Sequence, residues 1–526
     1  MIFHCVREYN RRCTKSKLAL ETAGTSVCPR IPGIRLKLLL ALTVRKLTWH
    51  AGDAWKVETQ SLIVEQCVKT VAMTADTKTY GLRSAVLSPL ETLAQSIALL
   101  APTVTPAMIL PLVFASAGNG TWLVFLLATC GLLCCAVNLS YLTAYTASPG
   151  SLYSYSFLGL GRQAAMLTGW ALMFAYLMGG AAALVGFANY TNATLSLAFS
   201  QQVHPALLLA ICSIITWLIA CRDIRLSTAL MLCLECLSIL LIAVVLSFAL
   251  YRFGAHFDLA QLELQSVTAD KVKLGLVLAI FSFVGFESAS TLGTEATNAH
   301  KSIAQAMRRS VILSGVFFVL ASYAEVVGFA ADPAALAKTN APLQDIAIKC
   351  GAPLLAVLTD IGAAISFFSC VLAAINASAR VLFFMSHDGI FSARLAQAHA
   401  TNRTPHVAVT ATAVLLAAVP AVLTICGYPL MDVYGWIGTI STYGFIVAYI
   451  LACISVPLYL RRVQKLRLVH IAVTIVTVGF MVLAFVGNVY PAPAAPYNWL
   501  PYLFLAYMLA GLFWYRHRAK RHTVST

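Results

Sequence analysis

Residues 279–303 read AIFSFVGFESASTLGTEATNAHKSI and place two glycines, two glutamates and several hydroxyl groups in what is otherwise an apolar helix. A charged or helix-breaking residue inside a bilayer is unfavourable unless it faces a water-filled cavity or another protein surface. Gly285, Glu287, Ser288 and Glu295 therefore indicate a functional site within a membrane-spanning segment.

The composition of the whole chain is that of a protein with many membrane-spanning helices. Hydrophobic residues make up 60% of the 526 positions, charged residues make up 11%, and the mean hydropathy is +0.81. Soluble globular domains do not reach these values. Since a helix needs about 20 apolar residues to cross the hydrocarbon core, the sequence predicts an all-α polytopic membrane protein. Its twelve predicted transmembrane helices cover roughly residues 89–115, 120–146, 163–191, 204–221, 226–251, 273–297, 308–330, 353–385, 405–426, 434–460, 467–488 and 499–515.

The net charge of +16 is divided unevenly between the loops on the two sides of the predicted membrane. If the chain enters from the cytoplasm, most basic loop residues face that side. The opposite side receives Arg252, Lys271, Lys273, Lys338 and Lys349. The positive-inside rule then predicts a multi-pass protein of the cell membrane, plasma or inner, with both termini in the cytoplasm. This distribution leaves no folded soluble domain for binding nucleic acid.

Residues 1–72 differ from the rest of the chain. They carry a basic excess, and their one apolar run, residues 34–44, is too short to cross a bilayer. A targeting peptide would be poor in acids, whereas this segment contains several. We expect residues 1–72 to be disordered or a mis-assigned extension, with the start at Met73; a genuine cytoplasmic extension is the alternative.

Two of the predicted helices are interrupted at matching positions. The first contains APTVTPAMILP at residues 101–111, and the sixth contains SFVGFES at residues 282–288. Paired interruptions are typical of inverted-repeat transporters with a site near the bilayer midplane. The sequence predicts a transporter core at 73–465 with two repeats of five helices, followed at 466–526 by two further helices and a basic tail.

Four segments resemble the amino acid-polyamine-organocation (APC) transporter superfamily. The sixth predicted helix matches its motif at Phe281, Ser282, Phe283, Val284, Gly285, Phe286 and Glu287, then at Glu295, Asn298, Lys301 and Ile303. Residues 148–170, 376–391 (with Arg380, Asp388 and Gly389) and 436–462 are similar to three further segments of that family, in the same order. The resemblance implies a LeuT-like 5+5 inverted repeat with broken helices 1 and 6.

The first predicted helix departs from the family pattern, which usually has Gly-x-Gly where this chain has Pro102 to Pro106. Prolines break a helix but donate no hydrogen bond. The candidate donors to a substrate carboxylate are therefore the N–H groups of Thr103, Val104, Thr105 and Ala107, at the positive end of the following half-helix. A simple proline kink is the alternative.

In the sixth predicted helix, the carbonyl groups of Phe281, Ser282 and Phe283 would accept from a substrate amine if the helix opens at Gly285. The resemblance implies that Phe281 closes over the substrate; plain packing is the alternative. Burial in a low dielectric favours the neutral form of a carboxyl group, so Glu287 is a candidate for taking up and releasing protons. A structural role, with Glu287 bonding to neighbouring backbone, is the competing interpretation.

Some proton-coupled relatives use a lysine midway along the fifth helix, and no lysine lies between Arg222 and Asp270 here. Either a group such as Glu287 carries a proton, or the protein exchanges substrates without an ion. The sequence favours a secondary transporter of a neutral amino acid. A cationic amino acid or polyamine transporter, a sensor of the same fold and a channel are the alternatives. No enzyme, cofactor or metal motif is found.

Overall fold

The structure, a computed structural model, describes residues 80–254, 258–329, 332–339, 341–490 and 494–524. The interpretation of residues 1–72 as an extension lies outside this range. Within the described residues the chain is helical, and extended pairing is limited to an isolated bridge between Leu87 and Ala296. The predicted all-α class is confirmed for this part of the chain.

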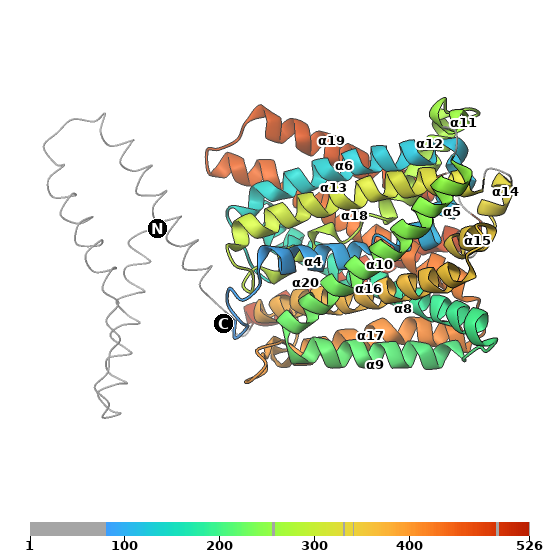
Figure 1. Ribbon diagram of the computed structural model, residues 1–526. Coiled ribbons are helices and arrows are strands. Elements are labelled where there is room, and N and C mark those ends of the chain that lie inside the picture. The colour runs from blue at the N-terminus through green and yellow to red at the C-terminus, as the bar shows by residue number, and fades with distance from the viewer. Residues whose placement is uncertain (1–79, 255–257, 330–331, 340, 491–493, 525–526) are drawn as a thin grey trace, which may run out of the picture. The chain divides into compact units, whose positions relative to one another are not determined.

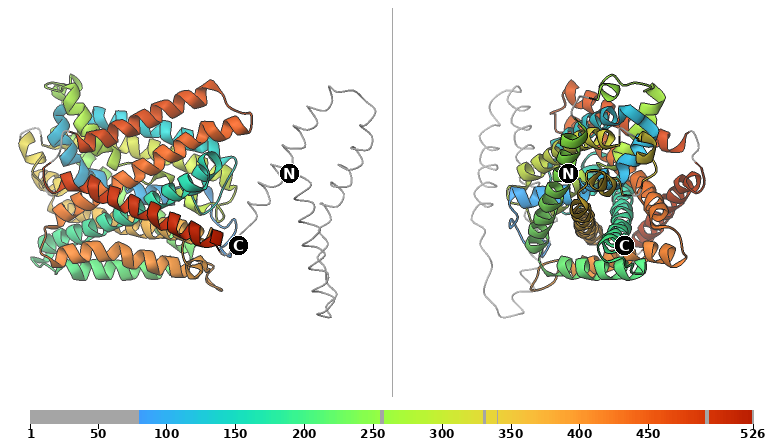
Figure 2. Two further views of the ribbon diagram at one scale, coloured as in Figure 1. Left: turned by 180° about the vertical axis from the view of Figure 1, so that it is seen from behind. Right: turned by 45° about the vertical axis from the view of Figure 1, so that its right-hand side comes forward.

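Long helices lie side by side in a bundle, and they remain so when the molecule is seen from behind or obliquely (Figures 1 and 2). These helices are α6 (Thr121–Thr143), α8 (Arg162–Phe199), α9 (Pro205–Arg222), α10 (Ile224–Phe253), α13 (Ala299–Gly328), α16 (Pro353–His387), α17 (His406–Ile425), α18 (Leu430–Arg462), α19 (Leu468–Val489) and α20 (Leu500–Val524). Short helical pieces connect them, namely η3 (Gly118–Gly120), α7 (Leu152–Leu160), α11 (Leu259–Leu262), α14 (Pro333–Leu336), α15 (Pro342–Lys349), η5 (Ala393–Ala396) and η6 (Tyr497–Trp499).

Two membrane-spanning segments are built from shorter pieces. The first consists of α4 (Pro89–Leu100), the π-helical turn η2 (Thr105–Ile109) and α5 (Leu110–Ala117). The second consists of α12 (Ala269–Phe281) and the 3-10 helix η4 (Phe286–Leu292). We call residues 101–104 the first break and residues 282–285 the second break. Both lie where the sequence predicts an interruption.

Ten stretches of the described residues are long and apolar enough to cross a membrane, against twelve predicted helices. Pro89–Thr143 forms a single stretch of 55 residues, because the first two predicted spans follow each other with almost no loop between them. The twelfth predicted helix, α20, is not among the ten, because basic residues such as Arg516 and Lys520 lower its hydropathy.

The long helices pack in two sets. The pieces that contain the breaks, α4, α5 and α12, pack with α6 and α13, whereas α8 packs along both α16 and α18. The α9 and α17 helices lie next to each other at one edge of the bundle (Figure 1). Both breaks therefore belong to one set of helices, and the α8, α16 and α18 set lies opposite them.

Candidate functional site

The first break is produced by proline. The α4 helix ends at Leu100 because the next residue, Ala101, precedes Pro102, and a residue before proline is disfavoured in the α region. Ala101 instead has a left-handed conformation with φ 44° and ψ 71°. An L-residue with a side chain rarely adopts this conformation, so the packing around the break holds it there.

Some of the predicted backbone donors are engaged within the first break. The N–H of Val104 donates to the Ala101 carbonyl at 2.9 Å, and the N–H of Ala107 donates to the Thr103 carbonyl at 3.3 Å. The hydroxyl of Thr105 is buried and has no hydrogen-bond partner among the described residues. The polar groups that the break can offer to a ligand are thus fewer than the sequence suggests.

A second proline ties the first break to α8. Because Pro111 lacks an N–H, the carbonyl of Ala107 receives no α-helical hydrogen bond from the residue four positions later. The hydroxyl of Tyr190, on α8, donates to this carbonyl at 2.6 Å. The polar group freed by the proline is therefore satisfied by a neighbouring helix rather than by solvent.

The second break is produced by glycine. Gly285 has φ +95°, and a β-carbon at this position would lie 2.7 Å from the Leu99 side chain. Only glycine adopts this conformation without strain. The N–H of Gly285 donates to the hydroxyl of Tyr449, on α18, at 3.1 Å. Through Leu99, the second break lies directly against the last turn of α4.

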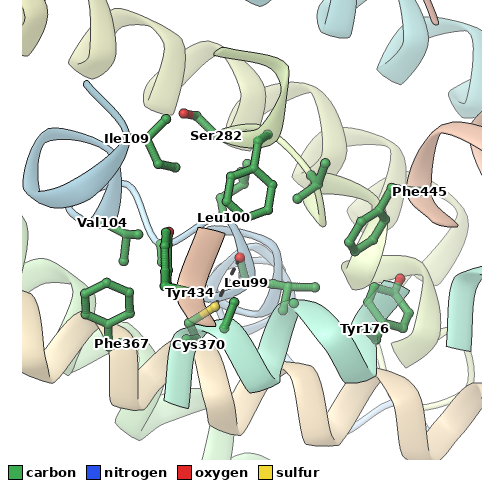
Figure 3. A pocket seen from close by; sticks show the side chains of 16 residues that line it. Leu99, Leu100, Val104, Ile109, Tyr176, Ser282, Phe367, Cys370, Tyr434 and Phe445 are labelled. Carbon is green, nitrogen blue, oxygen red and sulfur yellow. Dashed lines mark hydrogen bonds between the residues drawn. The ribbon is translucent and has the colours of Figure 1, made fainter. Parts of the chain in front are cut away.

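A cavity of about 490 Å³, including its open part, lies between the two breaks. In Figure 3, Val104, Ile109 and Phe367 lie toward one end of the cavity, and Tyr176 and Phe445 lie toward the other. The lining residues are Leu99, Leu100, Ala101, Val104, Ile109, Tyr176, Gly179, Ala182, Ala183, Phe281, Ser282, Val284, Phe367, Cys370, Tyr434 and Phe445.

Three of the predicted site residues line this cavity, namely Val104, Phe281 and Ser282. The hydroxyl of Ser282 is buried without a hydrogen-bond partner among the described residues, so a ligand can use it. Phe283 packs edge-on against Phe318 at 5.0 Å between ring centroids. The other predicted residues lie in or next to the breaks but do not line the cavity; they are Thr103, Thr105, Ala107, Phe283, Gly285 and Glu287.

Aromatic rings gather at the Phe281 side of the cavity. The rings of Phe281 and Tyr434 lie 6.3 Å apart edge to face, and those of Tyr434 and Phe367 lie 6.2 Å apart. The Phe281 ring rests on α18 at Gly438, where a β-carbon would lie 2.7 Å from it. This position suits a side chain that covers a ligand.

Glu287 is fully buried two residues beyond the second break and is held by two tyrosines. The hydroxyl of Tyr176, on α8, donates to one carboxylate oxygen at 2.7 Å, and the hydroxyl of Tyr449 donates to the other. Since Tyr176 also lines the cavity, Glu287 links the cavity to both α8 and α18. No ion pair between described residues includes Glu287.

Sequence reasoning missed both of these tyrosines. Tyr176 and Tyr449 lie in long apolar stretches, and a buried tyrosine that finds a hydrogen-bond partner is common in such helices. The only usable signal was the need of a buried carboxylate for donors. That need does not say which helix supplies them.

Two residues quoted from separate motifs meet at the far end of η4. Arg380, on α16, makes a two-pronged ion pair with Glu295, with nitrogen–oxygen distances of 2.6 and 3.0 Å. Both side chains are buried. The pair joins the segment that follows the second break to the helix set opposite it.

Comparison with known proteins is consistent with this geometry. A family model described as "Amino acid permease" matches residues 87–522. The chain is 24% identical over 326 residues to the branched-chain amino acid permease BcaP of Bacillus subtilis, covering 56% of this chain and 65% of that protein. It is 24% identical over 307 residues to the methylthioribose transporter of the same organism, covering 55% and 65%. It is 22% identical over 355 residues to cationic amino acid transporter 4 of Mus musculus, covering 64% and 54%.

The described residues form a bundle of helices in which ten stretches are long and apolar enough to cross a membrane, and two broken helices meet at one cavity. The chain belongs to the amino acid permease family of the APC superfamily, as the match over most of its length shows. The matched region spans less than two thirds of the length of each of these relatives. The family and these relatives are transporters rather than enzymes.

Proposed function

We propose that the protein is a secondary active transporter that moves a neutral amino acid across the cell membrane by alternating access. The observation that carries this proposal is the lining of the cavity between the two breaks. None of the 16 lining residues is an aspartate, glutamate, lysine or arginine. The ends of the half-helices can neutralise the two charges of a zwitterion without charged side chains.

The apolar lining also favours a substrate with an apolar side chain. Leu100, Val104, Ile109 and Phe367 offer hydrocarbon surface to the ligand. The names of the relatives are compatible with either a neutral or a cationic substrate, since one is a branched-chain amino acid permease and another a cationic amino acid transporter. A cationic side chain would need an acid in the lining. Asp360, on α16, is buried and is not one of the lining residues.

The second candidate is a transporter or exchanger of a cationic amino acid or polyamine. A sensor that keeps the fold and does not transport is a further alternative. Binding of a panel of ligands separates the two substrate classes, and counterflow in proteoliposomes separates a transporter from a sensor. Purified protein is heated with each common amino acid and polyamine, and a ligand that binds only the folded form raises the unfolding temperature. We expect leucine, isoleucine or valine to give the largest increase; a larger one with arginine, lysine or spermidine would overturn the proposal.

We propose roles for two residues at the second break. Phe281, beside Tyr434, covers the bound substrate on the side of α12. Glu287, held by Tyr176 and Tyr449, closes the opposite side and carries the proton if transport is coupled to one. The Phe281→Ala variant is expected to bind leucine more weakly and to release it faster, whereas the Phe317→Ala variant, outside the cavity lining, serves as its control.

We propose the LeuT-like 5+5 repeat for residues 73–465, with α4–η2–α5 and α12–η4 as the first helices of the two halves. Counting α5 and α6 as separate passes and α20 as the last gives twelve spans, with both termini in the cytoplasm of a plasma or inner membrane. A reporter fused after Thr526 is expected to be active on the cytoplasmic side only. Activity on the outer side alone would overturn this topology.

A further inference from the structure

Two thiol groups meet between the helices α6 and α18. The sulfur atoms of Cys135, on α6, and Cys453, on α18, lie 3.7 Å apart, and both side chains are completely buried. Both cysteines are free. They are 318 positions apart in the sequence, so the fold brings them together. A buried thiol usually packs as a small apolar side chain, but two thiols in contact can also be oxidised to a disulfide.

The two thiols lie well inside the membrane-spanning helices. Cys135 is eight residues before the last residue of α6, Thr143, and Cys453 is nine before the last residue of α18, Arg462. These separations correspond to about 12 and 14 Å along the helix axes. Charged thiols such as glutathione are excluded from these apolar surroundings. A small uncharged oxidant such as hydrogen peroxide is not excluded by charge.

The position of the two thiols allows a bond between them. Since bonded sulfur atoms lie about 2 Å apart, the two atoms need to approach by about 1.7 Å. Small rotations of the two side chains about χ1 supply a movement of this size. The backbones of α6 and α18 can therefore stay in contact as they are when the bond forms.

A bond at this place joins the two sets of helices. The α6 helix packs with the pieces that contain the breaks, whereas α18 packs along α8 in the opposite set. On α18, Tyr449 precedes Cys453 by four residues, so both side chains lie on one face of the helix. The Tyr449 hydroxyl accepts from the Gly285 N–H at 3.1 Å. A disulfide would thus fix α18 to α6 one turn from the residue that holds the second break.

We propose that Cys135 and Cys453 form an oxidation site, and that the disulfide made there by a peroxide holds the two sets of helices together and stops transport. Formation of the bond does not depend on the transport function proposed above. Its effect on transport rests on that function, because alternating access requires one set of helices to move against the other.

The reaction consumes one molecule of peroxide. The sulfur of one cysteine attacks a peroxide oxygen, the oxygen–oxygen bond breaks, and a sulfenic acid and one water form. The sulfur of the other cysteine then attacks the sulfenic sulfur, and the hydroxyl group leaves with a proton as a second water. The two sulfur atoms together lose two electrons, which the two oxygen atoms of the peroxide take up, and both thiol protons end in water.

The test uses full-length protein in proteoliposomes, with hydrogen peroxide as the oxidant and dithiothreitol as the reductant. Mass spectrometry of the digested protein should show the peptide of Cys135 joined to that of Cys453 with the loss of two hydrogen atoms. Counterflow of labelled L-leucine is measured before oxidation, after oxidation and after reduction. We expect oxidation to abolish counterflow in proportion to the joined fraction and dithiothreitol to restore it. Sulfinic and sulfonic acids would not be reduced.

Two variants remove the pair from either side. Cys135→Ala and Cys453→Ala should each lack the joined peptide and keep their counterflow after the same treatment. Both retain Cys370, the thiol in the cavity lining, so inactivation through Cys370 would persist in them. Cys134→Ala is the matched control, because the half-buried Cys134 is next to Cys135 on α6, and this variant should stay sensitive to peroxide.

Three results would overturn the proposal. They are the absence of the joined peptide from the oxidised parent, full counterflow by joined protein, and a loss of counterflow in Cys135→Ala and Cys453→Ala equal to that of the parent. Inactivation that dithiothreitol does not reverse would likewise contradict a disulfide as its cause.

Failure of the substrate assignment is recognised separately. If the untreated parent shows no leucine counterflow, the proposed substrate is wrong, whereas the joined peptide is detected without any substrate. The unfolding temperature then reports on the bond, because a disulfide constrains the unfolded chain. It should rise when the parent is oxidised and stay unchanged in Cys135→Ala. An equal change in the two proteins would overturn the oxidation site.

Discussion

Each of the two breaks contains a left-handed residue, but the chemistry that produces the breaks differs. In the first break Ala101 has φ 44° and is followed by Pro102, so the missing N–H of proline ends the helix and a strained alanine turns the chain. In the second break Gly285 has φ +95° and turns the chain without strain. The first break is thus produced by the missing N–H of Pro102, whereas the second requires that residue 285 has no side chain.

The breaks also differ in the hydrogen-bond partners of their polar groups. The first is held by backbone bonds within the break and by the Tyr190 hydroxyl. The second is held by Tyr449, which accepts from the Gly285 N–H and donates to Glu287. A change in the charge of Glu287 therefore reaches the second break directly. We expect the first break to keep its conformation and the second break to respond to the charge of Glu287.

Gly285→Ala should give the largest loss. A left-handed conformation costs a residue with a side chain about 1–2 kcal/mol, and the added β-carbon would lie 2.7 Å from Leu99. We expect leucine counterflow to fall about tenfold or more. Gly479→Ala, on α19 with open space around its α-carbon, is the matched control and should behave as the parent. Equal activity of the two variants would contradict the special role of Gly285.

Glu287→Gln should separate exchange from accumulation. Glutamine keeps the size of the side chain and one acceptor for the tyrosine hydroxyls but cannot ionise, so exchange should stay within about twofold of the parent. Accumulation driven by a pH gradient should disappear. Tyr176→Phe, which leaves the acid ionisable, should keep part of the accumulation. If Glu287→Gln accumulates leucine as well as the parent, Glu287 is structural.

Ser282→Ala should have a moderate effect on affinity alone. The Ser282 hydroxyl lines the cavity and has no hydrogen-bond partner among the described residues. Removing it should leave the unfolding temperature unchanged and raise the KM for leucine about three- to tenfold, as expected for one lost hydrogen bond. Thr103→Val should lower the unfolding temperature and leave the KM for leucine unchanged. The Thr103 hydroxyl bonds to Ser238 rather than facing the cavity. A lower unfolding temperature with an unchanged KM for Ser282→Ala would show that the hydroxyl is structural.

Ala101→Gly should have the smallest effect on transport. Glycine relieves the left-handed strain at the first break, so transport should stay within about twofold of the parent and the unfolding temperature should be equal or higher. A loss as large as that of Gly285→Ala would mean that the Ala101 methyl group, rather than the proline, shapes the first break.

The sequence predicts the all-α class and the positions of both breaks because proline and glycine act locally on the backbone. The N–H groups of Val104 and Ala107 form hydrogen bonds within the first break. The sequence does not reveal these bonds, because they depend on the local backbone geometry. The tyrosines around Glu287, and the Cys453 thiol that contacts Cys135, come from helices far away in the sequence. Which residues become partners depends on which helices pack together. The spacing of apolar residues along the sequence does not predict that packing.

The most direct test of the central claim is counterflow by the purified protein in proteoliposomes, with labelled L-leucine and L-arginine compared under identical conditions. The claim is that an apolar cavity between two helix breaks binds a neutral amino acid. The account predicts that labelled leucine enters liposomes preloaded with leucine and that labelled arginine does not enter liposomes preloaded with arginine. Arginine counterflow without leucine counterflow, or no counterflow with any amino acid, would contradict it.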